Sequence, residues 1–188
     1  MKRAWAIVVG CIVAGLSLAA PARAQDRPAT VPTRDVDVTY RMGTPEPGGL
    51  PMAQRMRWSV TAAKLRVDPP TPGLYMIVDY RAHRMAVVKT AERAVLDAAA
   101  PAAGLPGQSG ASYTRQGADS VAGLGCTNWD TADTSGRIAT VCMTEDGVLL
   151  RASQAGVLLL EAVAVAYVPQ DPAAFLPPDG FRHVAPRS

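Results

Sequence analysis

The stretch VAGLGCTNWDTADTSGRIATVCM, residues 121–143, decides the fold. It contains two runs of residues that favour strands, 121–129 and 137–143, which are separated by a polar loop at 130–136. Short apolar and β-branched runs on either side of a loop rich in Asp, Ser and Gly are typical of a β-hairpin. The sequence therefore predicts two antiparallel strands here.

The two cysteines of this stretch predict a covalent link across the hairpin. Partner numbers that sum to 268 place Cys126 directly opposite Cys142, and Trp129 opposite Ala139. Directly opposed residues have Cα atoms about 4.5–5.5 Å apart, which is within disulfide reach. Alternation puts Trp129 on the other face from the cysteines, and this more apolar face should point inward. We expect a structural disulfide, which would stabilise the fold by about 3 kcal/mol by closing the loop between the cysteines.

Alternating patterns continue outward from the hairpin in both directions. Residues 34–42 place apolar side chains at every second position, as a half-buried strand does. Residues 91–100 suit either a short helix or a strand, and Asp171 can cap one helical turn before the chain end. We predict an all-β fold, a curved antiparallel sheet of eight to ten short strands. Further strands are expected near residues 56–60, 65–67, 74–80, 84–90, 113–116, 148–153 and 157–168.

The first 24 residues have the pattern of a cleavable signal peptide. Lys2 and Arg3 precede a short apolar run, and the small residues Ala22 and Ala24 match a cleavage site before Gln25. An apolar run of this length is short for a membrane span. We expect cleavage between Ala24 and Gln25, which leaves no transmembrane segment.

Export would place the mature chain in the periplasm or outside the cell. Its length of about 164 residues suits a single domain. We expect a signal peptide at 1–24, a flexible lead-in at 25–33 and one β-rich domain at 34–188, and lipid attachment at Cys11 is the minor alternative. The chain has 19 basic and 16 acidic residues, and three of the basic ones lie in the leader, so the mature domain has no formal net charge. This balance gives no support for nucleic acid as a partner.

The residues that could carry catalysis form no recognisable set. His83 lies in an expected turn and His183 in the C-terminal tail, and neither stands in a motif. Two cysteines without a CxxC spacing make a poor metal signature. We therefore predict no catalytic residues, no metal and no cofactor, and we do not expect an enzyme.

The C-terminal half resembles a family of small exported bacterial domains of unknown function. The shared pattern is YTR at 113–115, GxxCxxW at 123–129 and C-[LM]-T-x-DGV-x-LR at 142–151, and a tail similar to QDPAAF at 170–175 often follows. The family is more distantly similar to the LolA-like lipoprotein carriers. That resemblance implies a half-barrel, in which a curved sheet wraps around an apolar concave face.

This curvature suggests where a ligand would bind. We expect Val38, Tyr40, Met56, Trp58 and Met76 to line the concave face and to hold an acyl chain or a similar apolar molecule. Phe175 and Phe181, which follow the last long strand, are expected to close one end of that face.

Two functions from different classes stay open. The first is a binding domain for a lipid or another apolar small molecule. The second is a structural or protein-interaction module of the cell envelope, without a small-molecule ligand.

Overall fold

The computed structural model describes residues 27–43, 52–100, 112–132 and 136–185. The expected leader, Cys11 and the expected cleavage site lie outside these residues. No helix in the described ranges is long and apolar enough to cross a membrane.

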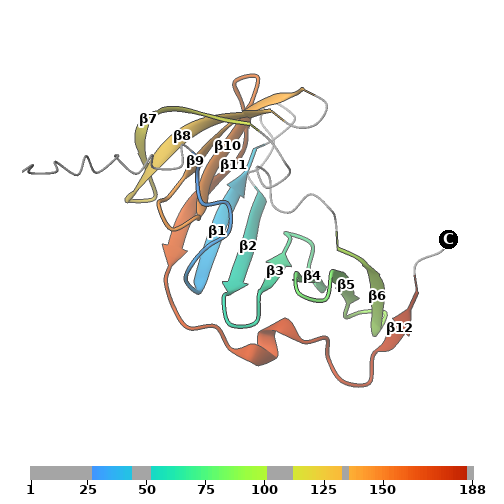
Figure 1. The fold of residues 1–188 in the computed structure, drawn as a ribbon. Coiled ribbons are helices and arrows are strands. Elements are labelled where there is room, and N and C mark those ends of the chain that lie inside the picture. The colour runs from blue at the N-terminus through green and yellow to red at the C-terminus, as the bar shows by residue number, and fades with distance from the viewer. Residues whose placement is uncertain (1–26, 44–51, 101–111, 133–135, 186–188) are drawn as a thin grey trace, which may run out of the picture.

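Within the described residues, the strands form one continuous twelve-stranded sheet (Figure 1). Its order is β12-β6-β5-β4-β3-β2-β1-β11-β10-β9-β8-β7, and one short 3-10 turn, η1 (Pro172–Phe175), follows β11. The strands are β1 (Val36–Met42), β2 (Met52–Ser59), β3 (Lys64–Asp68), β4 (Leu74–Asp79), β5 (Arg84–Lys89), β6 (Ala94–Ala99), β7 (Tyr113–Val121), β8 (Leu124–Ala132), β9 (Ile138–Met143), β10 (Leu149–Gln154), β11 (Val157–Ala166) and β12 (Arg182–Val184).

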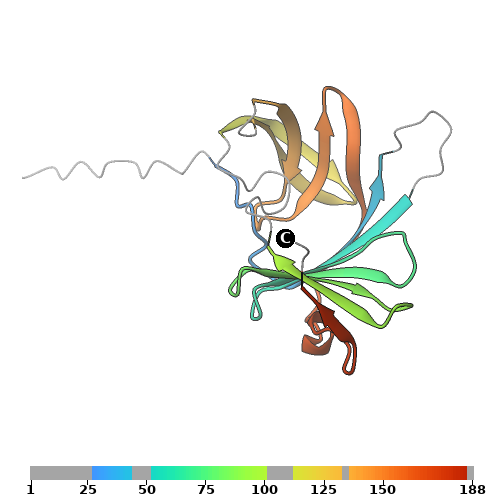
Figure 2. The ribbon, with the colours of Figure 1, turned by 90° about the vertical axis from the view of Figure 1, so that its right-hand side faces the viewer.

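Two antiparallel meanders make up this sheet. The first runs from β1 to β6 and the second from β7 to β11, and they join where β1 pairs with β11. Only β12 runs parallel to its neighbour, β6, at one edge of the described sheet. Figure 2 shows that the sheet is bent, so that the two meanders enclose a concave face. The prediction of an all-β fold with a curved sheet, one disulfide and a short helical turn is confirmed, but the described residues form twelve strands rather than the expected eight to ten.

The disulfide is present, but the hairpin register differs from the prediction. Cys126 and Cys142 are bonded, with Cα atoms 5.5 Å apart. In the ladder Asn128 faces Cys142 and Trp129 faces Val141, so partner numbers sum to 270 rather than 268. The disulfide is therefore diagonal. A slip by two residues keeps every side chain on its face, so Trp129 still points to the opposite side from the cysteines.

Within residues 91–100 the chain forms the strand β6 (Ala94–Ala99), which decides between the two alternatives. Val95 on β6 and Val88 on the neighbouring β5 are opposite each other and are both fully buried. A short segment has little helical stability of its own, so pairing with β5 determines its structure. The expected strand over residues 121–129 is also divided. Ala122 and Gly123, both at positive φ, form a turn between β7, which ends at Val121, and β8, which begins at Leu124.

The concave face carries the larger apolar core. In the first meander one row of the ladder runs through Val38, Met56, Val67 and Met76. In the second meander Trp129, Val141, Ala152 and Leu160 form a matching row. Val38 and Val67 in the first row and all four members of the second row are buried, and they belong to one apolar cluster, so the two meanders pack against each other across the concave face.

The opposite face of β3–β6 is covered by the C-terminal segment. Phe175 of η1, which is 1% exposed, packs against a cluster that contains Tyr75, Ile77, Val88 and Val95. Figure 2 shows η1 on the side of the sheet away from the second meander. The expectation that Phe175 and Phe181 close the concave face is therefore wrong. Alternation identifies an apolar anchor but does not indicate which face it covers.

Candidate functional site

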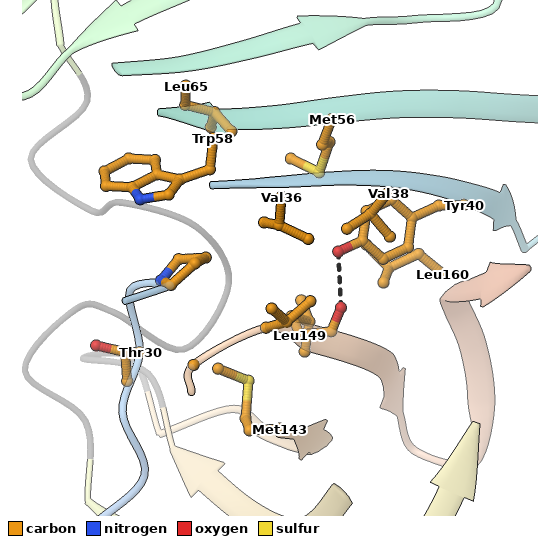
Figure 3. Close-up of a pocket in the computed structure, with 13 residues that line it drawn as sticks. Thr30, Val36, Val38, Tyr40, Met56, Trp58, Leu65, Met143, Leu149 and Leu160 are labelled. Carbon is orange, nitrogen blue, oxygen red and sulfur yellow. Dashed lines mark hydrogen bonds between the residues drawn. The ribbon is translucent and has the colours of Figure 1, made fainter. Parts of the chain in front are cut away.

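The concave face contains an apolar cavity between the two meanders (Figure 3). Its volume is about 30 Å³, which is the space of a single water molecule. Side chains from β1, β2, β3 and β11 form one wall, and the segment 143–149 around the β9–β10 turn forms another. The lining residues are Thr30, Pro32, Val36, Val38, Tyr40, Met56, Trp58, Leu65, Met143, Gly147, Val148, Leu149 and Leu160.

The residues selected from the sequence fall on this face, and four of the five line the cavity. These four are Val38, Tyr40, Met56 and Trp58. Met76 lies in the same ladder row as Met56, but two strands further along the sheet, on β4. It is half-buried against the same core and does not line the cavity.

Tyr40 crosses the concave space. Its hydroxyl donates a hydrogen bond of 2.7 Å to the carbonyl oxygen of Leu149 on β10. Since β11 lies between β1 and β10 in the sheet, this bond links strands that are not neighbours. Burial raises the pKa of the Tyr40 phenol far above its ordinary value, so the group stays protonated and uncharged. Tyr40 therefore holds the two walls of the cavity together.

Trp58 brings an unpaired polar group to the cavity. The residue is 7% exposed, and its ring packs edge-on against Tyr80, with centroids 5.4 Å apart. Its indole Nε1 is buried and has no hydrogen-bond partner. Figure 3 shows this nitrogen facing the side of the cavity on which Thr30 lies. A buried donor without an acceptor costs about 1–3 kcal/mol, so its persistence here requires an explanation.

The remaining lining residues were not selected from the sequence. Met143, Leu149 and Leu160 belong to the second meander, and Thr30 and Pro32 precede β1. Alternation gives each strand an apolar face, but it does not show that β11 lies beside β1. The walls could be brought together only by knowing the strand order.

The two histidines lie away from this cavity. His183 on β12 is joined to Asp97 on β6 through Nδ1 and Oδ2 at 2.7 Å, and Asp97 also faces Arg84 at 3.8 Å. His83 occupies the β4–β5 turn at positive φ. These contacts tie β12 to the sheet edge. Within the described ranges, no three His, Cys, Asp or Glu residues are grouped to hold a metal ion.

The comparisons with known proteins support the fold and no more. No family model matches the chain, and no curated protein matches it. An uncharacterized conserved protein from Thermus thermophilus has a similar structure, with a TM-score of 0.59 and 11% identity over 81% of this chain and 91% of that one.

Two other solved structures are similar over a part of their own length. PNGF-II has a TM-score of 0.51 and 11% identity, and the match covers 81% of this chain and 31% of that chain. MucB has a TM-score of 0.47 and 12% identity over 81% of this chain and 60% of that one. This chain therefore spans about a third of the former and less than two thirds of the latter.

Proposed function

We propose that this chain is an exported, non-enzymatic domain that binds a lipid acyl chain or a similar apolar molecule on the concave face of its sheet. The observation that carries the proposal is the convergence of Val38, Tyr40, Met56 and Trp58 on one cavity, which the second meander completes. The opposite face of the first meander is covered by Phe175, so we assign the ligand to the concave face.

The chemistry of the cavity favours an apolar ligand. Two of the wall residues, Met56 and Met143, are methionines, whose flexible side chains adapt to ligands of variable shape. The Tyr40 hydroxyl is already occupied by the Leu149 carbonyl oxygen. No charged side chain is among the lining residues, so a strongly charged ligand would lose its hydration without compensation.

Export is part of the same proposal. The disulfide between Cys126 and Cys142 suits an oxidising compartment. The sequence pattern places a cleavable leader at residues 1–24. Intact-mass measurement of protein from the periplasm should give a chain that begins at Gln25. A mass that retains the leader, or a lipid on Cys11, would contradict cleavage at this site.

The second candidate is a structural or protein-interaction module of the envelope. It is favoured by the small size of the cavity, about 30 Å³, because sites for small molecules usually measure about 300–1,000 Å³. Binding of an acyl chain therefore requires the concave face to open. If it never opens, the same residues are simply the core of the domain.

Tryptophan emission separates the two candidates. Titration of the purified mature protein with a medium-chain fatty-acid ester should shift the emission, and native mass spectrometry should find a bound molecule. Trp58→Phe should remove most of the shift, and Trp129→Phe only the remainder, because Trp129 does not line the cavity. Unchanged emission, together with protein that carries no lipid, would reject ligand binding and leave the structural module.

A further inference from the structure

Residues 27–33, which we call the strap, cross the concave face and divide it into two hollows. Thr30 and Pro32 line the cavity beside Trp58. The other end of the strap lines a wider, more open hollow of about 620 Å³, whose wall contains Trp129 together with charged residues such as Asp119 and Glu145. Met143 lines both hollows, so they meet at this side chain. Removal of the strap would join them into one larger site.

The turn between β9 and β10 holds the strap in place. The Thr33 amide donates a hydrogen bond of 2.9 Å to the carbonyl oxygen of Asp146. The Arg34 guanidinium donates two bonds, of 3.0 and 2.9 Å, to Oδ2 of the Asp146 carboxylate. Oδ1 of the same carboxylate accepts from the hydroxyls of Thr144, at 2.6 Å, and Tyr167, at 3.0 Å. Thr144 and Tyr167 therefore orient the Asp146 carboxylate toward Arg34, which follows the strap.

Gly147 in this turn leaves room for the strap backbone. A Cβ atom at position 147 would overlap the carbonyl group of Val31. The φ angle of Gly147 is +88°, a conformation that other residues adopt only with strain. Residues 144–148 (TEDGV) belong to the sequence pattern noted above, to which no function has been attached. The structure gives this motif a role as the latch of the strap.

The strap itself is anchored lightly. It forms no strand, and Pro32 is its only buried residue, whereas Val31 is 41% exposed. Arg27 at its start lies over the ring of Tyr113, with 5.3 Å to the ring centroid. Segments with few buried apolar contacts open at low free energy, so the strap can leave while the sheet stays folded.

The unpaired donor of Trp58 lies in the part of the face that the strap covers. Pro32, which lines the same cavity, has no N–H group and a side chain without an acceptor. The indole Nε1 therefore stays without a partner while the strap is closed. A ligand that brings an acceptor oxygen to this point satisfies the donor, which the closed state does not.

We infer that the ligand is an amphiphile, with an acyl chain and a carbonyl oxygen, that displaces the strap and accepts a hydrogen bond from Trp58 Nε1. This inference rests on the proposed function. The latch at Asp146 sets how readily the strap leaves, and the acyl chain fills the apolar cavity and the space that Thr30 and Pro32 vacate, up to Met143.

Two ligands with the same number of carbon atoms test the hydrogen bond. Methyl decanoate offers a carbonyl oxygen, and undecane has the same number of carbon atoms but no acceptor. Trp58→Phe keeps an aromatic ring but removes the donor. It should therefore weaken the binding of methyl decanoate about tenfold and the binding of undecane less than twofold, as measured by displacement of a fluorescent apolar probe. Tyr75→Phe, which changes an aromatic side chain on the opposite face of the sheet, should affect neither ligand. Equal weakening of both ligands, or no weakening of either, would overturn the hydrogen bond while leaving binding itself intact.

Hydrogen exchange tests the displacement of the strap. Saturation with methyl decanoate should speed exchange of the Thr33 amide, because its acceptor on Asp146 is lost when the strap leaves. Arg34→Ala should speed ligand association severalfold. The matched variant Arg55→Ala, which removes an exposed ion pair with Asp37 on the other face, should not. Unchanged protection of Thr33 at saturation would overturn the strap mechanism. Absence of binding by both the original protein and Arg34→Ala would instead reject the proposed function.

Discussion

The two described ends of the chain both cover the sheet, but they do so in different ways. The N-terminal strap, residues 27–33, lies on the concave face beside a cavity and an unpaired indole donor. The C-terminal segment, residues 170–184, lies on the opposite face, where Phe175 is buried and β12 extends the sheet. Arg66 donates a hydrogen bond of 2.9 Å to the Ala174 carbonyl and stacks on Tyr75, which fixes this segment further.

This difference indicates which of the two covering segments is part of the folded core. A segment that buries a large aromatic ring and pairs with a strand cannot leave without exposing the core, so it unfolds with the domain. A segment that fully buries only one proline, and whose C-terminal end is held by the β9–β10 turn, can leave alone. The two covers should therefore respond differently to the same kinds of perturbation.

The largest effect is expected from the C-terminal cover. Phe175→Ala should lower the free energy of unfolding by about 3–5 kcal/mol, because a fully buried ring is replaced by a cavity. Urea denaturation measures the change. Leu176→Ala is the control, since this neighbour is 55% exposed and should change stability by less than about 0.5 kcal/mol. Equal effects of the two variants would show that η1 does not anchor the cover.

The disulfide should have the next largest effect. Replacement of Cys126 and Cys142 by Ser should lower the free energy of unfolding by about 3 kcal/mol and leave the fold recognisable by circular dichroism. The second meander carries both the disulfide and the strap latch, so its loosening should also reduce protection of the Thr33 amide. Free thiols in the native exported protein would contradict a structural disulfide.

A smaller effect is expected at the latch itself. Gly147→Ala should destabilise the protein by about 1–2 kcal/mol, because alanine is strained at positive φ. It should also release the strap, because the added Cβ meets Val31. Gly156→Ala is a matched control, since Gly156 has φ +78° and open space around its Cβ position. Both variants should lose similar stability, but only Gly147→Ala should abolish protection of Thr33. Loss of this protection in both would show that strain, not contact with Val31, moves the strap.

The smallest effect is a pH dependence of the strap. Burial alone would raise the pKa of Asp146, but hydrogen bonds from Thr144, Arg34 and Tyr167 outweigh burial and hold this pKa below its ordinary value of 3.8. A carboxylate with a lowered pKa stabilises the folded state above the pKa of the unfolded chain and loses this effect as pH falls through the folded value. The latch should thus hold at neutral pH and weaken below about pH 4.

Amide exchange at acid pH compares the two covers directly. Protection of Thr33 should fall below that of Arg182, whose amide donates to the Arg93 carbonyl in the C-terminal cover. Asp146→Asn should make Thr33 protection low at every pH. If Thr33 and Arg182 lose protection together, acid unfolds the whole domain and the strap is not an independent element.

Much of the fold could be predicted because its main signals are local. Alternation in residues 36–42 and 56–58 reports the two faces of a strand, so it places Val38, Tyr40, Met56 and Trp58 on apolar faces, and all four line the cavity. Two cysteines on the same face of one hairpin predict a disulfide. Alternation does not distinguish the predicted register, with partner numbers that sum to 268, from the observed one, with a sum of 270, because a shift by two residues preserves both faces.

What only the tertiary structure decided is which elements meet across long distances in the sequence. Alternation shows that a strand has an apolar face, but it does not specify the neighbour. The pairing of β1 with β11 brings the second meander against Trp58, and this completes the cavity. Two further contacts likewise form only when distant parts of the chain close around the curved sheet. Phe175 covers one side of the sheet, and the strap packs on Asp146 and Gly147. A local sequence pattern does not predict such contacts, because they form, and stabilise the fold, only when the whole sheet is assembled.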